Sequence, residues 1–196
     1  MMNSTTVSVT YLRVTPSLSQ QALGFTLIEM LITIAIMAII GGMGGAYLIP
    51  QLQLLEATNT ANELKSFIIT GKQDALIYQK PITLCVANAN QTCVLTGGES
   101  LLEFIDVNDN KAYDAGTDKL NNSRKLSLNY GNLRTVLGIA GGVIILKPDS
   151  GRPIGYIGHI KYCPTNGNTA NMLKVSFNMT GIVKIIPNRE QATGCP

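Results

Sequence analysis

The sequence has few charged residues, no tryptophan and a single histidine. Asp, Glu, Lys and Arg make up 14% of its 196 residues, whereas about a quarter is usual for a soluble globular domain. The net charge of +3 is too small to indicate nucleic-acid binding by itself. The lone His159 excludes catalysis by a pair of histidines within the chain. Because a Rossmann, P-loop or nucleophile-elbow motif is also lacking, we predict that the chain is not an enzyme.

The apolar residues are concentrated in one run, residues 25–49, in which Glu29 is the only charged residue. As a helix this run is about 37 Å long, enough to cross a bilayer core of about 30 Å. It is apolar on all faces, which disfavours a helix buried in a soluble core. An ordinary secretory signal has its small-residue cleavage site after the apolar stretch, whereas Gly24 stands before it. Cleavage at Gly24 leaves the apolar helix on the mature protein.

The four cysteines are an even number in a chain that the apolar segment marks as exported, which favours two disulfides. Four cysteines allow three pairings. We favour the pairing of sequence neighbours, Cys85–Cys93 and Cys163–Cys195. The alternative is four reduced or metal-binding thiols, although the sequence contains no Cys-x-x-Cys.

Residues 24–31, Gly-Phe-Thr-Leu-Ile-Glu-Met-Leu, resemble the prepilin processing motif of type IV pilins and type II secretion pseudopilins. The resemblance implies a leader at residues 1–24, cleavage by prepilin peptidase between Gly24 and Phe25, and N-methylation of Phe25. It also implies that Glu29 matches the register of subunits during assembly. The amine that cleavage creates on Phe25 of a neighbouring subunit is a suitable partner for this acid. The alternative is a Glu29 at the lipid headgroups without a role.

Residues 50–80 continue the helix with an amphipathic pattern, so that one helix covers about residues 25–79. Its buried stripe is predicted to be Ala57, Ala61, Leu64, Ile68, Gly71, Ala75 and Tyr78. We expect the opposite side to carry Glu56, Asn62, Lys65 and Lys72. The helix should end near Lys80, before Pro81.

The head, residues 81–196, has the pattern of short strands separated by turns. The predicted strands are 81–86, 101–107, 125–130, 133–137, 143–147, 158–163, 173–177 and 182–186, with a hairpin turn at 178–181. Residues 82–85, 102–110 and 146–152 resemble the GspH/FimT-type minor pilins and pseudopilins, and Cys163 and Cys195 fit the FimT/FimU branch. The resemblance implies an α+β, type IV pilin-like fold, with one long N-terminal helix packed on a small antiparallel β-sheet head.

A polar loop in the head has the oxygen ligands of a calcium-binding loop at positions 1, 3, 5 and 9. These residues are Asp106, Asn108, Asn110 and Asp114. Lys111 replaces the usual glycine, and Thr117 stands where a bidentate Glu is expected. The loop predicts a weak calcium site, and the alternative is a hairpin loop whose side chains cap turns.

A second candidate site in the head is a DNA-binding surface. Some FimT-type minor pilins bind DNA through a Gly-Arg-x-Arg stretch, for which this chain has Gly181-Ile182-Val183-Lys184. The positive charge that remains there is predicted on Lys174, Lys184 and Arg189, and phosphate contact requires only such charge.

The function that the sequence predicts is that of a minor pilin subunit supporting assembly of a type IV pilus. The alternatives are a DNA-binding minor pilin for natural transformation and a minor pseudopilin of a type II secretion system. We expect a single-pass protein of the bacterial inner membrane, with residues 81–196 in the periplasm, that later enters a pilus or pseudopilus. Its expected partners are prepilin peptidase, other pilins and, in the transformation alternative, DNA. No cofactor other than calcium and no small-molecule substrate is expected.

Overall fold

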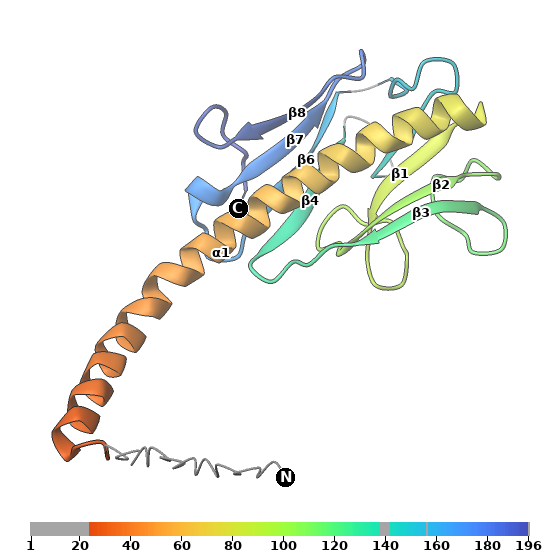
Figure 1. Cartoon of the computed structure of the whole chain (residues 1–196). Helices are drawn as coiled ribbons and strands as arrows, with labels where there is room; N and C mark the ends of the chain where they lie inside the picture. The colour runs from red at the N-terminus through yellow and green to blue at the C-terminus, as the bar shows by residue number, and fades with distance from the viewer. Residues whose placement is uncertain (1–23, 138–141, 156, 196) are drawn as a thin grey trace, which may run out of the picture. The chain divides into compact units, whose positions relative to one another are not determined.

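The structure is a computed structural model that describes residues 24–137, 142–155 and 157–195, without the side chains of residues 43–47. The chain divides into two compact units, Met1–Gly44 and Gly45–Pro196, and the boundary falls within the long helix α1 (Leu27–Tyr78). The predicted leader lies outside the described residues up to position 23. In the described part of the chain, α1 is followed by strands and one short 3₁₀ helix (Figure 1). They are β1 (Ile82–Ala87), β2 (Ser100–Ile105), β3 (Lys119–Lys125), β4 (Gly131–Leu137), β5 (Val143–Leu146), β6 (Gly158–Pro164), η1 (Thr169–Asn171), β7 (Leu173–Phe177) and β8 (Val183–Pro187).

Helix α1 is 52 residues long and contains Pro50, so the prediction of one long helix is confirmed. It ends two residues before the position expected from Pro81. Gln79 adopts a left-handed backbone with φ of 51°. Its side-chain Nε2 donates a hydrogen bond of 2.6 Å to the carbonyl oxygen of Leu76 and so satisfies one of the free carbonyls at the helix end.

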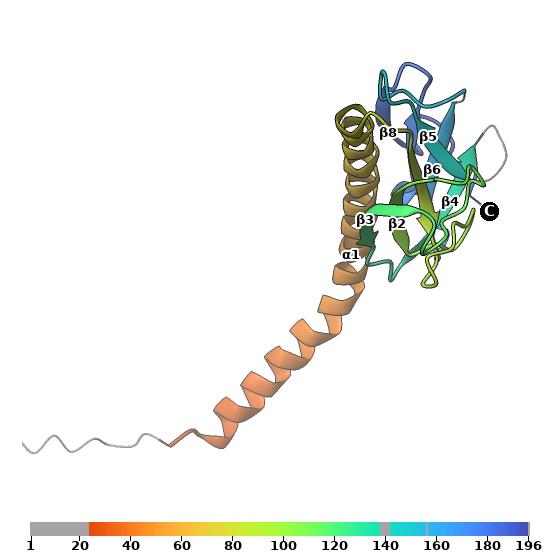
Figure 2. The ribbon, with the colours of Figure 1, turned by 90° about the vertical axis from the view of Figure 1, so that its right-hand side faces the viewer.

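The strands form two four-stranded antiparallel sheets with the orders β3-β2-β1-β5 and β4-β6-β7-β8. Figure 2 shows the second half of α1 running along one side of these sheets. The predicted fold class, a long N-terminal helix on an antiparallel β head, is confirmed. The hairpin predicted at 178–181 is also present, because Gly181 has a φ of 80° and its N–H donates to the carbonyl of Asn178 at 2.8 Å.

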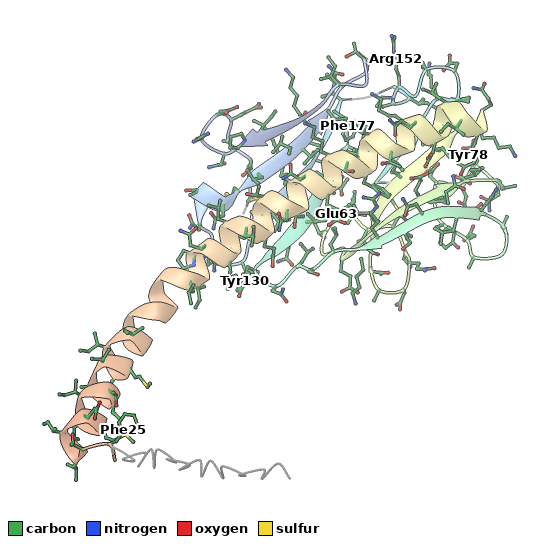
Figure 3. All side chains as sticks on the ribbon, in the orientation of Figure 1. Phe25, Glu63, Tyr78, Tyr130, Arg152 and Phe177 are labelled. Carbon is green, nitrogen blue, oxygen red and sulfur yellow. A yellow bond between two sulfur atoms is a disulfide. The ribbon has the colours of Figure 1, made fainter. Side chains whose placement is uncertain are left out.

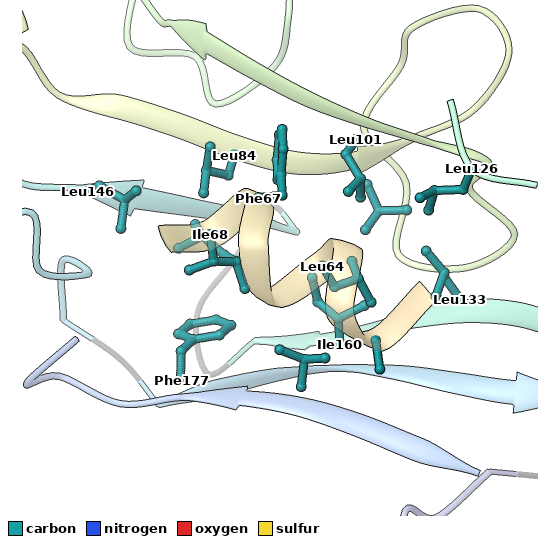
Figure 4. Close-up of a cluster of buried hydrophobic side chains, with 14 of the residues drawn as sticks. Leu64, Phe67, Ile68, Leu84, Leu101, Leu126, Leu133, Leu146, Ile160 and Phe177 are labelled. Atoms are coloured by element: carbon teal, nitrogen blue, oxygen red, sulfur yellow. The ribbon is translucent and has the colours of Figure 1, made fainter. Parts of the chain in front are cut away.

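The main hydrophobic core lies between α1 and both sheets (Figure 4). The predicted stripe on α1 is buried except for Tyr78, and Phe67 joins it. Helix α1 approaches the sheet closely at Gly71. A Cβ atom added there would lie 2.9 Å from Cδ2 of Leu84 and 3.2 Å from Cδ1 of Leu146. The close packing expected from small residues on this stripe is therefore present at Gly71.

A second, smaller core covers the other face of the first sheet. Because side chains alternate along a strand, Leu102 and Phe104 of β2 face away from α1 and pack with Cys85 of β1. The ring of Tyr113 meets that of Phe104 edge to face, with centroids 5.4 Å apart. This core connects the polar loop that follows β2 to the sheet.

Two sequence predictions are wrong in this part of the chain. The strand expected at 125–130 is absent, and β3 instead covers Lys119–Lys125. This segment is polar and lies at the edge of its sheet, with a register shift against β2 between Glu103 and Phe104. An irregular, half-exposed edge strand does not show the alternation of apolar residues that marks a strand in sequence.

The second wrong prediction concerns the polar face of α1. Glu56 and Lys72 were expected on the side away from the head, but both bind it. Lys72 Nζ donates to the carbonyl of Gly181 at 2.6 Å, and the Glu56 carboxylate accepts a hydrogen bond from Tyr162. Long polar side chains at the border of a buried stripe can reach over the sheets beside it.

Candidate functional site

The predicted cleavage junction lies just before α1. Gly24, Phe25 and Thr26 precede the first helical residue, Leu27. The side chain of Phe25 is 72% exposed, and no atom outside its own neighbourhood lies within 4 Å of the Cβ position of Gly24. In the described part of the chain, nothing covers the bond between Gly24 and Phe25.

Thr26 caps the start of α1 through the backbone of Glu29, a contact that was not predicted from the sequence. The backbone N–H of Glu29 lies 3.3 Å from Oγ1 of Thr26 and 3.1 Å from the Thr26 carbonyl oxygen. A Thr that precedes a helix, with a Glu three residues later, is the sequence of a capping box. An acid in the first turn is also favoured by the helix dipole. The Thr-x-x-Glu spacing was the signal in the sequence that could have shown this.

The N-terminal part of α1 exposes its large apolar side chains. Leu27 is 78% exposed and Met37 is 71% exposed, and Ile28 and Ile40 are exposed as well. Phe25, just before the helix, is also exposed (Figure 3). Over the described residues, no helix meets the length and hydropathy of a membrane-spanning segment. The single membrane pass over residues 25–49 therefore remains a prediction.

Both favoured disulfides are present in the structure. Cys85 and Cys93 are bonded across a separation of 8 residues, and Cys163 and Cys195 across 32. The first joins β1 to the segment that follows it. The second ties the C-terminal segment to the end of β6. Both bonds favour an oxidising compartment such as the periplasm.

The structure brings the four predicted calcium ligands together in the loop between β2 and β3. The side-chain amides of Asn108 and Asn110 donate to Oδ2 of Asp114 at 3.1 and 2.5 Å. The backbone N–H of Lys111 donates to Oδ2 of Asp106 at 2.8 Å, whereas Oδ1 of Asp106 is buried without a hydrogen-bond partner.

The remaining contacts of this loop are those of turn capping. Oδ1 of Asn110 accepts from the backbone N–H of Ala112 at 2.9 Å. The Asp118 carboxylate accepts from Asp114 and Val107 backbone N–H groups at 2.8 and 2.9 Å. Among the described residues, no group of three or more His, Cys, Asp or Glu side chains is arranged to hold a metal. The calcium site stays a prediction, because the arrangement also fits the turn-capping alternative.

The three predicted DNA-binding residues lie in different environments. Lys184 and Arg189 are exposed. Lys174 is only 6% exposed, and its Nζ donates to the carbonyl oxygen of Ala192 at 3.4 Å. Burial, followed by the positive charge of Lys161, lowers the pKa of Lys174. Lys174 is therefore unavailable for phosphate contact here, and DNA binding through Lys184 and Arg189 stays a prediction.

The contact that sequence analysis missed most completely is the one made by Glu56. One carboxylate oxygen accepts from the backbone N–H of Asn129 at 2.7 Å, and the other from that of Tyr130 at 2.9 Å and the hydroxyl of Tyr162 at 2.9 Å. Burial, then the hydrogen bond and charge of Glu56, raises the pKa of Tyr162. No local sequence signal links these residues, because 73 or more positions separate Glu56 from each partner.

Comparisons with known proteins concern the N-terminal motif and the fold of the chain. Residues 20–45 match the model of the prokaryotic N-terminal methylation motif. No curated protein sequence is detectably similar to the chain.

Among solved structures, the chain is similar to the minor pseudopilin EpsH from the Type 2 Secretion System of Vibrio cholerae, with 14% identity and a TM-score of 0.48 over 67% of this chain and 97% of that chain. It is also similar to the type IV minor pilin FimU of Pseudomonas aeruginosa, with 14% identity and a TM-score of 0.49 over 68% of this chain and 90% of that chain. Similarity at these values does not decide between a pilin and a pseudopilin. The methylation motif overlaps the start of the long helix α1, and an antiparallel β head follows that helix. Together they support the prediction of a type IV pilin-like chain, a minor pilin or a pseudopilin.

Proposed function

We propose that the chain is a minor pilin subunit of a type IV pilus. Prepilin peptidase cleaves it between Gly24 and Phe25, Phe25 is N-methylated, and the mature subunit joins other major and minor pilins. Before assembly, residues 25–49 hold it in the bacterial inner membrane as a single pass, with residues 81–196 in the periplasm. The observation that carries the proposal is the methylation motif at 20–45, whose residues from Leu27 onward belong to a helix with exposed apolar side chains.

The exposed apolar residues require a partner in every state of the subunit. Each square ångström of apolar surface in water costs about 25 cal/mol, and residues such as Leu27, Ile36 and Ile40 are all more than half exposed in the isolated chain. Lipid covers these side chains before assembly, and the corresponding helices of other subunits cover them in a filament. The same surface thus serves membrane anchoring and assembly.

Glu29 gives this apolar helix a specific contact. A carboxylate inside a bilayer costs about 2.5–3.5 kcal/mol on insertion scales, so it needs a proton or a cation. Cleavage after Gly24 creates an amine on Phe25, and this amine in a neighbouring subunit neutralises Glu29 when the two helices are in register. The competing explanation for Glu29 is its place in the capping box with Thr26.

Two substitutions separate these explanations. Glu29→Gln keeps a residue that serves in a capping box but removes the charge. Thr26→Ala removes the hydroxyl that caps the helix and leaves the charge. We expect Glu29→Gln to be cleaved but poorly incorporated into filaments, and Thr26→Ala to be incorporated nearly as well as the wild type.

The measurement is the ratio of the subunit in sheared filaments to that in membranes, determined by immunoblotting. Gly24→Glu is the control, because it should accumulate uncleaved. If Glu29→Gln enters filaments at the wild-type ratio, Glu29 acts only at the helix start and its proposed role in assembly is wrong.

A pseudopilus subunit would use the same helix. This alternative is tested in the bacterium that encodes the chain. Deletion of the gene should reduce surface pili and leave secretion of exoproteins unchanged if the subunit belongs to a pilus. Loss of secretion with normal pili would assign it to a type II secretion system instead.

A further inference from the structure

The most unusual polar group in the head is the carboxyl group of Glu103 in β2. Residues two positions apart on a strand point to the same face of the sheet. Leu101 and Ile105 belong to the core beneath α1, so the Glu103 side chain lies on that face as well. Glu103 is 0% exposed, and within the described residues neither of its carboxyl oxygens receives a hydrogen bond from an N–H or hydroxyl group. A fully buried, unpartnered carboxylate costs several kcal/mol, which makes the charged form unfavourable at this site.

The groups around Glu103 come from three elements. On α1, Asp74 lies three residues after Gly71, where the helix meets Leu84, the residue that pairs with Glu103. Asp74 also acts on the acidity of Glu103. From β3, Asn121 and Arg124 are the polar and charged residues beside it, and from β1 its pairing partner is Leu84. Two charged groups among these neighbours therefore act on Glu103, the acid Asp74 and the cation Arg124.

Neither polar residue of β3 neutralises Glu103. Asn121 falls in the register shift, because Asn122 pairs with Glu103 while Leu120 pairs with Phe104. The Nδ2 atom of Asn121 is buried without a hydrogen-bond partner. Arg124 lies over the ring of Phe67, 5.9 Å from its centroid. Three buried polar atoms, two on Glu103 and one on Asn121, are thus left without partners.

Burial has the largest effect on the acidity of Glu103. It raises the pKa, and the hydrogen bond with Asp74 and the negative charge of Asp74 raise it further, to about 7. Asn121 and Arg124 act in the opposite direction and are weaker. Two carboxyl groups within hydrogen-bonding distance are stable when they share a proton, because one then donates to the other.

We propose that Glu103 keeps a proton and donates it to the Asp74 carboxylate, and that this hydrogen bond holds the last turns of α1 against β2. We call this pair the proton latch. While the proton is present, Asp74 and Glu103 are joined by a hydrogen bond between helix and sheet. When the proton leaves, the buried negative charge of Glu103 faces that of the half-buried Asp74, and the contact between the end of α1 and β2 loosens. The proposal therefore predicts that this pair stabilises the head most at acidic pH, where the proton is present.

The direction of the pH effect follows from the proton count. Between the ordinary pKa of a glutamate, 4.5, and about 7, the folded protein binds more protons at Glu103 than the unfolded chain does. The contribution of the latch is fully present below pH 4.5 and is lost as the pH rises through 7. The unfolding equilibrium constant should rise on the order of 100-fold over this range.

His159 has the opposite effect on stability, so the experiment must separate the two groups. Burial, with the charges of Lys161 and Lys174, lowers the pKa of His159, and stability from this source increases with pH. The difference between the wild type and Glu103→Gln cancels the contribution of His159. Glu190→Gln is the matched control, because Glu190 is exposed.

The test uses the full chain in detergent micelles. Carbon-13 NMR of chains labelled at the glutamate carboxyl groups should show one resonance with a midpoint near pH 7 that is absent in Glu103→Gln. Asp74→Asn should lower this midpoint but not return it to the ordinary glutamate pKa of 4.5, because Glu103 stays buried. Chemical unfolding should show wild-type stability falling between pH 5 and 8, a fall that Glu190→Gln keeps and Glu103→Gln loses.

Two results would overturn the proposal. One is a Glu103 resonance that titrates near pH 4.5 in the wild type. This result does not depend on whether any variant folds. The other is a Glu103 midpoint that Asp74→Asn leaves unchanged, because the two acids would then not share a proton.

Discussion

Glu56 is the polar residue of α1 whose removal should do most damage to the head. Its carboxylate receives hydrogen bonds from the backbone N–H groups of Asn129 and Tyr130 and from the hydroxyl of Tyr162. In Glu56→Ala these donors lose their acceptor. Asn129 is exposed and Tyr130 is half-buried, whereas Tyr162 is almost fully buried. Water can replace the carboxylate at Asn129 but not readily at the Tyr162 hydroxyl.

The expected loss follows from these contacts. Hydrogen bonds to a charged group contribute about 1.5–3 kcal/mol each. With one donor rehydrated and the effects of the other two not fully additive, Glu56→Ala should lose about 3 kcal/mol. For a chain of this size, 1 kcal/mol changes Tm by about 2–4 °C, so the Tm should fall by about 6–12 °C.

The assay is thermal unfolding of the full chain in detergent, followed by the near-ultraviolet circular dichroism of the tyrosines. Glu63→Ala is the matched control, because Glu63 lies on the same helix and makes none of these three contacts. Tyr162→Phe should cause a smaller loss, and the effects of Glu56→Ala and Tyr162→Phe should be less than additive. A Tm for Glu56→Ala within about 2 °C of the Glu63→Ala value would refute this account of how the head is held to α1.

The remaining predictions concern the core and the polar loop. Gly71→Val should destabilise the head by about 1–3 kcal/mol, because its Cβ meets Leu84 at 2.9 Å. Gln73→Val, on an exposed position, should change stability much less, and equal losses in denaturant unfolding would contradict this explanation. Calcium should bind the full chain weakly, with heat in calorimetry at millimolar concentrations that Asp106→Asn reduces. The absence of heat from the wild type would remove the calcium site.

The sequence was sufficient to predict the long helix, the positions of most strands along the chain and the favoured pairing of the two disulfides. Each of these has a local signal: the apolar run, alternation, the turn at 178–181 and the spacing of the cysteines. Edge strand β3 was misplaced because its polar residues, from Lys119 to Lys125, carry no alternation. An edge strand is recognised by pairing with its neighbour, and this pairing is visible only in the folded structure.

The polar residues of the candidate sites were predictable in part. The Gly24–Phe25 junction and Glu29 could be proposed from the sequence because they lie in one short motif, and their roles remain predictions. The roles of Glu56 and Glu103 were not found, because each depends on a partner from a distant segment, Tyr162 for the first and Asp74 for the second. The candidate DNA-binding surface is also smaller than predicted, because Lys174 lies beneath the C-terminal segment. No local pattern in the sequence indicates this burial.

The most direct test of the proposed function is the mass of the N-terminal peptide of the native protein, isolated from membranes and from sheared filaments. The proposal predicts that the chain begins at Phe25 and carries one methyl group on the Phe25 amine in both fractions. It also predicts that Gly24→Glu retains residues 1–24 and is absent from filaments. A native chain that retains its leader, or one that begins after residue 49 and so lacks the apolar helix, would contradict it.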